Sequence, residues 1–134
     1  MTSVAPGPEL ERSAPAEVPE RVVARLVAAI NDGRLGDATE CFSRKGCLVT
    51  PDATAVHGRD EIQRLLEQLI ARRSRIEVVL STELRAGDVA LSRQRWLLHS
   101  DADDGSHYTQ QLTASLILHF IEGSWKLVIA APWS

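Results

Sequence analysis

The sequence predicts an α+β fold in which three helices pack on one face of a curved, mainly antiparallel sheet. Two successive patterns along the chain predict it. Up to residue 73, apolar side chains recur at the spacing of amphipathic helices. After residue 75, stretches rich in β-branched and aromatic residues are separated by turns that contain Gly or Asp, which is typical of antiparallel hairpins. Helices that precede such a sheet favour the α+β class.

Three helices and one short strand are expected in the first part of the chain. The first helix covers about residues 20–31, where the apolar residues form one stripe. The second helix starts at Asp37, which is spaced with Glu40 as a capping box. A short strand at residues 47–50 follows, and the third helix covers about residues 60–73.

Four strands are expected in the second part, at residues 75–84, 89–100, 108–121 and 124–131. Short connections with Gly or Asp join them into an antiparallel meander. Long strands in one curled sheet wrap around the helices, so we expect a pocket between the two layers.

The composition favours one soluble domain. The chain has 134 residues, and its 15 Lys and Arg against 18 Asp and Glu give a formal net charge of -3. This mildly acidic balance argues against nucleic-acid binding, and no apolar run is long enough to span a membrane. Two cysteines form neither a disulfide framework nor a zinc-ligand quartet, so we expect a cytoplasmic protein.

We expect residues 1–18 to form a disordered or loosely docked tail, and residues 19–134 to form the domain. Four of the six prolines crowd at or before Pro19, and the first segment contains no aromatic residue. Such a segment cannot bury enough apolar area to offset the entropy lost on ordering.

Several short motifs follow one another along the domain. In chain order they are Ile30-Asn31-Asp32-Gly33-Arg34-Leu35, Val49-Thr50-Pro51-Asp52, His57-Gly58-Arg59-Asp60-Glu61-Ile62, Gly87-Asp88-Val89-Ala90-Leu91, Gly123-Ser124-Trp125-Lys126-Leu127-Val128 and Pro132-Trp133-Ser134. In this order and spacing, the sequence resembles the SnoaL-like branch of the NTF2-like, ketosteroid-isomerase-like superfamily. It looks most like the accessory proteins of polyketide and enediyne biosynthesis that are often labelled SgcJ/EcaC-like.

That resemblance implies a cone-shaped α+β barrel with one deep apolar pocket, commonly in a homodimer formed through the outer sheet face. It also implies a protein that works without a cofactor on a small hydrophobic or polyketide-like ligand. Members of the superfamily include isomerases, epoxide hydrolases, dehydratases, cyclases and binding proteins, so the residues of the pocket must decide the chemistry.

The acid and base groups of the family's enzymes are missing at the matching positions. Thr50 stands where the steroid isomerases have their Asp base, Leu26 where they have Tyr, and Leu116 where they have a protonated Asp. A Thr hydroxyl cannot remove a carbon-bound proton, because its pKa is far too high for it to be deprotonated without an activating base. The strands also lack the Asp residues of the epoxide hydrolases, and Glu122, the one acid after Tyr108, lies in a turn.

Four residues remain as candidate catalytic groups, namely Arg93, Arg95, His57 and Asp52. Arg93 and Arg95 share one strand face, and the sequence leaves open whether that face is the inner or the outer one. Inside a cavity, two guanidinium groups would demand an anionic or carbonyl-rich ligand. Asp52 is interpreted as a turn residue or, with a shift of register, as an acid near the pocket.

The resemblance, together with the apolar pattern of the helices and the polar positions within apolar strands, indicates which residues line the pocket. The expected lining residues are Leu26, Phe42, Thr50, Trp96, Gln111, Leu116 and Trp133. No metal site is expected, because no His pair and no His–acid spacing suits metal coordination.

Two functions remain open. The first is a cofactor-independent cyclase- or isomerase-like enzyme, or an accessory factor, that acts on a hydrophobic intermediate of polyketide or enediyne biosynthesis. The alternative is a non-catalytic ligand-binding or protein-interaction module that has lost the family's catalytic carboxylates. An acid inside the cavity would favour the first function, and a cavity walled only by apolar residues would favour the second.

Overall fold

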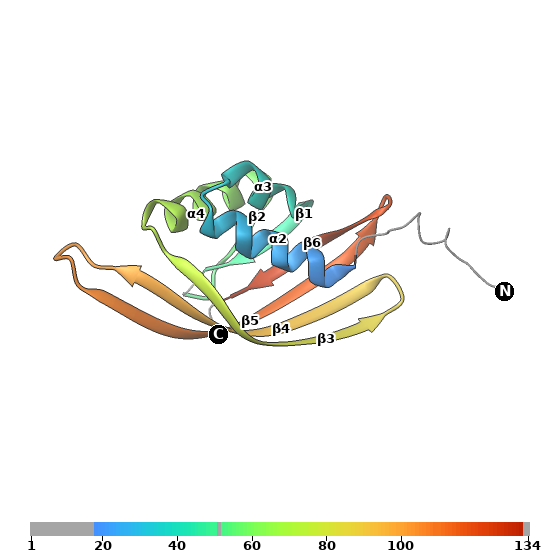
Figure 1. Ribbon diagram of the computed structural model, residues 1–134. Coiled ribbons are helices and arrows are strands. Elements are labelled where there is room, and N and C mark those ends of the chain that lie inside the picture. Colours follow the sequence, from blue (N-terminus) through green and yellow to red (C-terminus); the bar gives the residue numbers. More distant parts are fainter. Residues whose placement is uncertain (1–17, 51, 133–134) are drawn as a thin grey trace.

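The computed structural model describes residues 18–50 and 52–132, so nearly all of the expected tail lies outside the described part of the chain. In this described part, three helices cover one face of a curved six-stranded sheet (Figure 1). The predicted α+β class is therefore confirmed.

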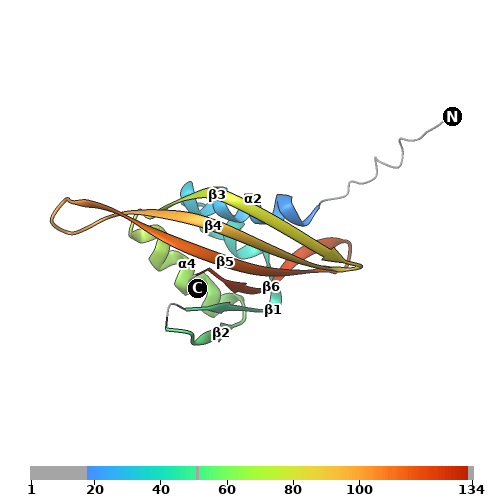
Figure 2. The same cartoon turned by 90° about the horizontal axis from the view of Figure 1, so that it is seen from below.

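The sheet is built around the predicted meander. Its strands are β1 (Phe42–Val49), β2 (Ala55–His57), β3 (Arg75–Ala86), β4 (Val89–Asp101), β5 (His107–Ile121) and β6 (Ser124–Ala131). They lie in the order β2-β1-β6-β5-β4-β3, and Figure 2 shows them from the side opposite the helices. All neighbouring strands are antiparallel except β1 and β6, which are parallel. Because β2 and β3 form the two edges, the sheet is open and not closed into a barrel.

The predicted short strand at residues 47–50 belongs to the longer strand β1. Phe42 already pairs with Leu127 of β6, and the register then shifts before Cys47. Gly46 lies in this irregular stretch, where a Cβ would come within 2.9 Å of the carbonyl oxygen of Leu127. The polar residues before Gly46 do not alternate with apolar ones, so the pattern hid the first half of the strand.

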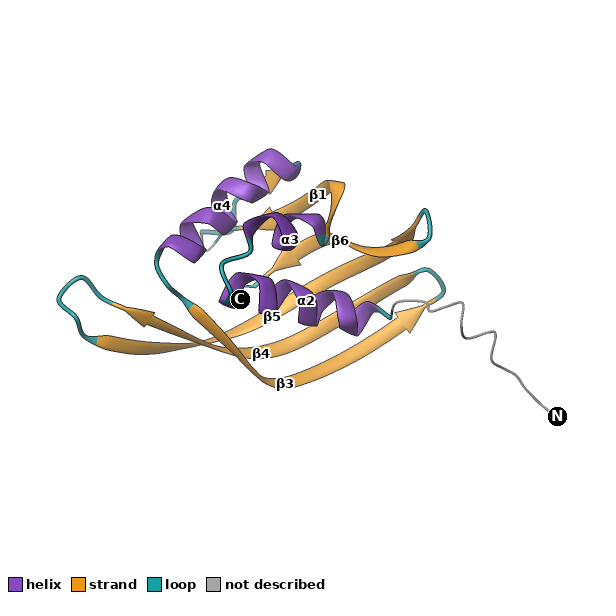
Figure 3. Ribbon diagram, turned by 45° about the horizontal axis from the view of Figure 1, so that its top comes forward, coloured by secondary structure: helices purple, strands orange, loops and turns teal. Residues whose placement is uncertain are grey.

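The helices are α2 (Pro19–Asn31), α3 (Leu35–Glu40) and α4 (Arg59–Ala71), and all lie on the concave side of the sheet (Figure 3). The predicted capping box of Asp37 and Glu40 is wrong. Helix α3 begins at Leu35, and its N-cap residue, Arg34, makes no side-chain capping hydrogen bond. Asp37 lies inside the helix, where its carboxylate accepts a hydrogen bond from Arg34.

Two of the sequence motifs anchor helices to the sheet. At the end of α2, Asn31 donates from Nδ2 to the Ile76 carbonyl at 2.9 Å and accepts from the Ile76 N–H at 2.7 Å. At the start of α4, the Arg59 guanidinium donates twice to the Phe42 carbonyl, at 3.1 and 2.7 Å. These contacts fix the end of α2 against β3 and the start of α4 against β1.

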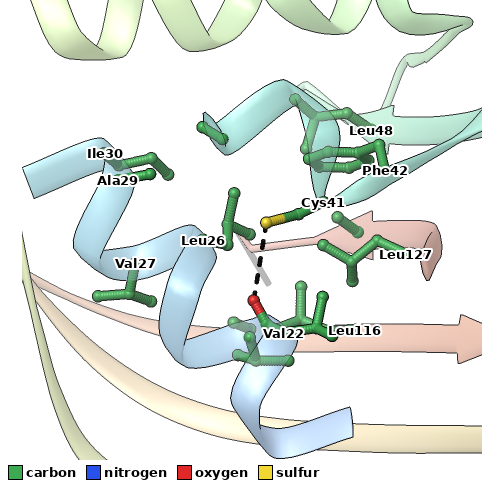
Figure 4. Packing of buried hydrophobic residues seen from close by; sticks show 14 of the residues in the cluster. Val22, Leu26, Val27, Ala29, Ile30, Cys41, Phe42, Leu48, Leu116 and Leu127 are labelled. Carbon is green, nitrogen blue, oxygen red and sulfur yellow. Dashed lines mark hydrogen bonds between the residues drawn. The ribbon is translucent and has the colours of Figure 1, made fainter. Parts of the chain in front are cut away.

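The core lies between α2, α3 and the inner face of the sheet (Figure 4). Val22 and Leu26 of α2 are buried together with Leu116 of β5 and Leu127 of β6. The thiol of Cys41 approaches the Val22 carbonyl at 3.8 Å in the same cluster. Cys41 therefore packs as a small buried hydrophobic residue, as its sequence setting indicates.

Candidate functional site

A cavity of about 160 Å³ lies between α2, α4 and the inner face of the sheet. Its wall is mainly apolar and includes Leu26, Ile30, Leu66, Trp96, Leu112 and Leu116. Three polar residues, Thr50, Gln68 and Arg72, belong to the described lining as well. A concave apolar space with a few polar groups is the usual form of a small-molecule site, which makes this cavity the candidate site.

The periodicities of strand and helix bring these side chains together. Trp96 of β4 pairs directly with Leu112 of β5, and both are buried on the inner face. Alternate residues of a strand share a face, so Leu98 joins the same wall. Gln68 of α4 and Arg72, the C-cap residue that follows this helix, are four residues apart and therefore lie on the same side of it.

A chain of hydrogen bonds holds the indole of Trp96 in the cavity wall. Trp96 Nε1 donates to Gln94 Oε1 at 2.7 Å, and Gln94 Nε2 donates to the Ser81 hydroxyl at 3.3 Å. The Ser81 and Ser92 hydroxyls both donate to Glu83 Oε2, at 2.7 and 2.8 Å. Because Gln94 is fixed at both ends of its amide, the orientation of the indole is fixed as well.

Arg93 and Arg95 lie on the outer face of the sheet and are exposed, so they do not line the cavity. The hypothesis that places them inside is wrong for a physical reason. Their neighbours Trp96 and Leu98 alternate with them along β4 and are buried, and a strand cannot turn both sets inward. The two arginines border a shallow surface depression together with residues that include Thr82.

Asp52 and His57 also lie outside the cavity lining and are exposed. Asp52 occupies the turn before β2, where its carboxylate accepts hydrogen bonds from the Thr50 hydroxyl and, at 3.2 Å, from the Thr54 N–H. These hydrogen bonds, first the one from Thr50, lower the pKa of Asp52. A lowered pKa weakens a carboxylate as a general base, so the geometry favours the interpretation of Asp52 as a turn residue.

The structure places most of the expected lining residues around the cavity. Those that line it are Leu26, Phe42, Thr50, Trp96 and Leu116. Gln111 is exposed on the outer face, because it pairs with Leu97 of β4, which has the same parity as the two arginines. Trp133 lies outside the described residues.

Sequence reasoning missed two polar lining residues, Gln68 and Arg72. Both lie at the exposed border of the apolar stripe of α4, which contains Leu65 and Leu69. Their spacing of one helical turn beside that stripe was the available signal. It is a weak signal, because polar residues border the apolar stripe of most amphipathic helices.

The described lining residues include no Asp, Glu, His or Cys. The cavity therefore offers apolar contact, the hydrogen-bonding groups of Thr50 and Gln68, and the charge of Arg72. Among the described residues, no group of three His, Cys, Asp or Glu could hold a metal ion. None of the described helices is long and apolar enough to cross a membrane.

The SnoaL-like domain is the family whose model matches the chain, over residues 23–128. This match runs from α2 into β6 and covers all of the sequence motifs except the last one, at residues 132–134. No curated protein matches the chain.

Solved structures from several bacteria are similar to this fold. A candidate ketosteroid isomerase from Shewanella frigidimarina has a TM-score of 0.75 at 16% identity, over 84% of this chain and 91% of its own. A candidate dehydratase of the NTF2-like family from Streptomyces avermitilis has a TM-score of 0.76 at 16% identity, over 85% and 91%. A candidate calcium/calmodulin-dependent protein kinase II association domain from Xanthomonas campestris has a TM-score of 0.74 at 17% identity, over 91% of both chains.

These low identities show a common fold and not a common activity. The fold and the family match together confirm the resemblance that the motifs indicate. The chain belongs to the SnoaL-like domain family, within the NTF2-like, ketosteroid-isomerase-like superfamily.

Proposed function

We propose that the protein binds a small hydrophobic intermediate of natural-product biosynthesis, of the polyketide or enediyne type, and acts on it as a binding or accessory factor. The observation that carries the proposal is the cavity of about 160 Å³ whose described lining contains apolar residues and no acid. Apolar burial drives binding in such a space, and a general base is missing from the described wall.

The test is native mass spectrometry of the protein purified gently from its native host, with and without organic extraction. We expect a small hydrophobic compound to co-purify with the wild-type protein. In the variant Leu69→Trp, the larger side chain fills the cavity from α4, so the compound should be lost. Gln63→Trp is the matched control, because Gln63 is an exposed residue of the same helix and does not line the cavity. A compound retained equally by both variants would contradict binding in the cavity.

A cyclase- or isomerase-like enzyme is the second candidate function. The observation in its favour is the hydrogen bond between Asp52 and Thr50, because it connects a carboxylate to a residue of the cavity lining. If the Asp52 carboxylate acts on the ligand through Thr50, the variant Asp52→Asn will still bind the captured compound but will no longer convert it. Equal conversion by the wild-type protein and the variant would remove this candidate.

We also propose a homodimer formed through the outer sheet face. This face carries apolar side chains that are 39–63% exposed, among them Leu84, Val89 and Ile129. Burial of such residues against a second copy would remove them from water. Sedimentation equilibrium tests the proposal, and Ile129→Lys should shift the protein to a monomer. A monomeric wild-type protein at micromolar concentration would contradict it.

A cytoplasmic location remains part of the proposal. Its support is that Cys41 and Cys47 are thiols rather than disulfides in the structure, as a reducing compartment requires. Fractionation of the host cells would test it, and recovery of the protein outside the cytoplasm would overturn it.

A further inference from the structure

We infer that the ligand is a small amphipathic acid, with an apolar body about the size of one ring and an anionic group beside Arg72. This inference rests on the proposed binding function and names the class of ligand that the cavity selects. It follows from two features of the described lining, namely the volume of the cavity and the position of its polar residues.

The volume limits the apolar body of the ligand. The cavity measures about 160 Å³, and an engineered protein cavity of about 150 Å³ with a similar apolar lining binds benzene. Interiors are closely packed and yield little to a larger guest. The cavity therefore encloses one ring or a comparably short chain, and a fused polycyclic body does not fit inside it.

Two of the three polar lining residues come from the C-terminal end of α4. Gln68 lies in the last turn of α4 and Arg72 is the C-cap residue of this helix, whereas the sheet and α2 contribute apolar side chains such as Ile30 and Trp96. Thr50 is the remaining polar residue, and its hydroxyl already donates to Asp52 and accepts from the Thr54 N–H. Gln68 and Arg72 are thus the side chains available to bind a polar group of the ligand.

The charge of this part of the lining is positive. Arg72 is its one charged residue among those described, and none of the described acidic residues lies within ion-pair distance of it. The C-terminus of α4 carries only about half an elementary negative charge, so the full charge of the guanidinium dominates. A carboxylate can accept two parallel hydrogen bonds from a guanidinium, and the Gln68 amide can donate a further one.

Three probes with the same body and different polar groups test the assignment by isothermal titration calorimetry. They are 4-phenylbutanoate, 4-phenylbutan-1-ol and 4-phenylbutan-1-amine. Because Arg72 is exposed, we expect the carboxylate to bind only about three- to tenfold more tightly than the alcohol. The amine should bind most weakly, because its charge repels that of Arg72. Equal affinities for the carboxylate and the alcohol, or tighter binding of the amine, would overturn the inference.

Two variants assign the preference to one side chain. Arg72→Gln should abolish the preference for the carboxylate over the alcohol, because it removes the charge that distinguishes the two polar groups. Arg73→Gln is the matched control, because Arg73 is the next residue, is also exposed and does not line the cavity. It removes the same net charge, so an equal loss of preference in both variants would show a general charge effect and would overturn the role of Arg72.

A fourth probe tests the size limit. The compound 4-(pyren-1-yl)butanoate has the same acid group on a four-ring body and should fail to displace 4-phenylbutanoate. Displacement at comparable concentration would overturn the limit of one ring. The failure of all four probes, together with no compound captured from the host, would overturn the proposed function itself. A captured compound without an acid group would refute only this inference.

Discussion

Replacement of Asn31 by Ala tests how the cavity wall is held in place. The Asn31 side chain bridges the end of α2 to both backbone groups of Ile76, and Ile76 is 3% exposed and lines the cavity. The variant loses two hydrogen bonds and leaves backbone groups of a buried strand residue without these partners. A buried backbone group left without its partner costs about 1–3 kcal/mol. Because both hydrogen bonds are only part-buried, we expect the lower part of the range for two such groups, a loss of about 2–4 kcal/mol in the free energy of unfolding.

Urea denaturation followed by far-UV circular dichroism measures this loss. The midpoint should fall while the slope of the free energy against urea stays the same, because the surface exposed on unfolding does not change. Asp32→Ala is the control, since Asp32 is exposed and is paired only with Arg34, at 3.3 Å, among the described residues. Its cost should stay within about 0.5 kcal/mol. A loss below that value for Asn31→Ala would refute the reasoning.

Three further outcomes are expected. Gln94→Leu removes the acceptor of the Trp96 indole, so near-UV circular dichroism of the tryptophans should weaken; an unchanged spectrum would contradict the role of Gln94. Arg59→Ala should cost about 1–3 kcal/mol in urea denaturation, because both hydrogen bonds to Phe42 are lost. The lowered pKa of Asp52 stabilises the fold above pH ~4 and not at lower pH. The difference in urea midpoint between the wild-type protein and Asp52→Asn should therefore shrink as the pH falls below 4, and a constant difference would refute it.

The elements that the sequence predicted well have a clear single periodicity. Helix α2, helix α4 and the four strands from β3 to β6 begin and end within a few residues of the predicted bounds. The strand β2, the start of α3 and the first half of β1 were missed. Gly36 hides the start of α3 and the polar residues 43–45 hide the first half of β1. The packing of Ala38 and Phe42 into the core determines these two elements instead. Such long-range contacts cannot be derived from local spacing.

The candidate site was predictable only where burial decides which face of a helix or strand points inward. Residues such as Leu26 and Leu116 had to point inward as parts of apolar stripes, and they line the cavity. The face of Arg93 and Arg95 could not be decided, because Gln94 and Ser92 on the opposite face are polar as well. These two buried side chains become compatible with the core only through hydrogen bonds to Ser81 and Glu83 of the neighbouring strand.

The motif residues that identify the family stabilise the fold, and they do not determine which ligand the cavity binds. Asn31 and Arg59 each belong to one of these motifs, and the side chains of both form hydrogen bonds with backbone atoms of the sheet. Residues with this role are needed wherever helices must be fixed above a curved sheet, whatever the cavity contains. The groups that would select a ligand, Gln68 and Arg72, lie in no motif. Substitution at these two positions can therefore change the ligand while the anchors, and the fold with them, stay the same.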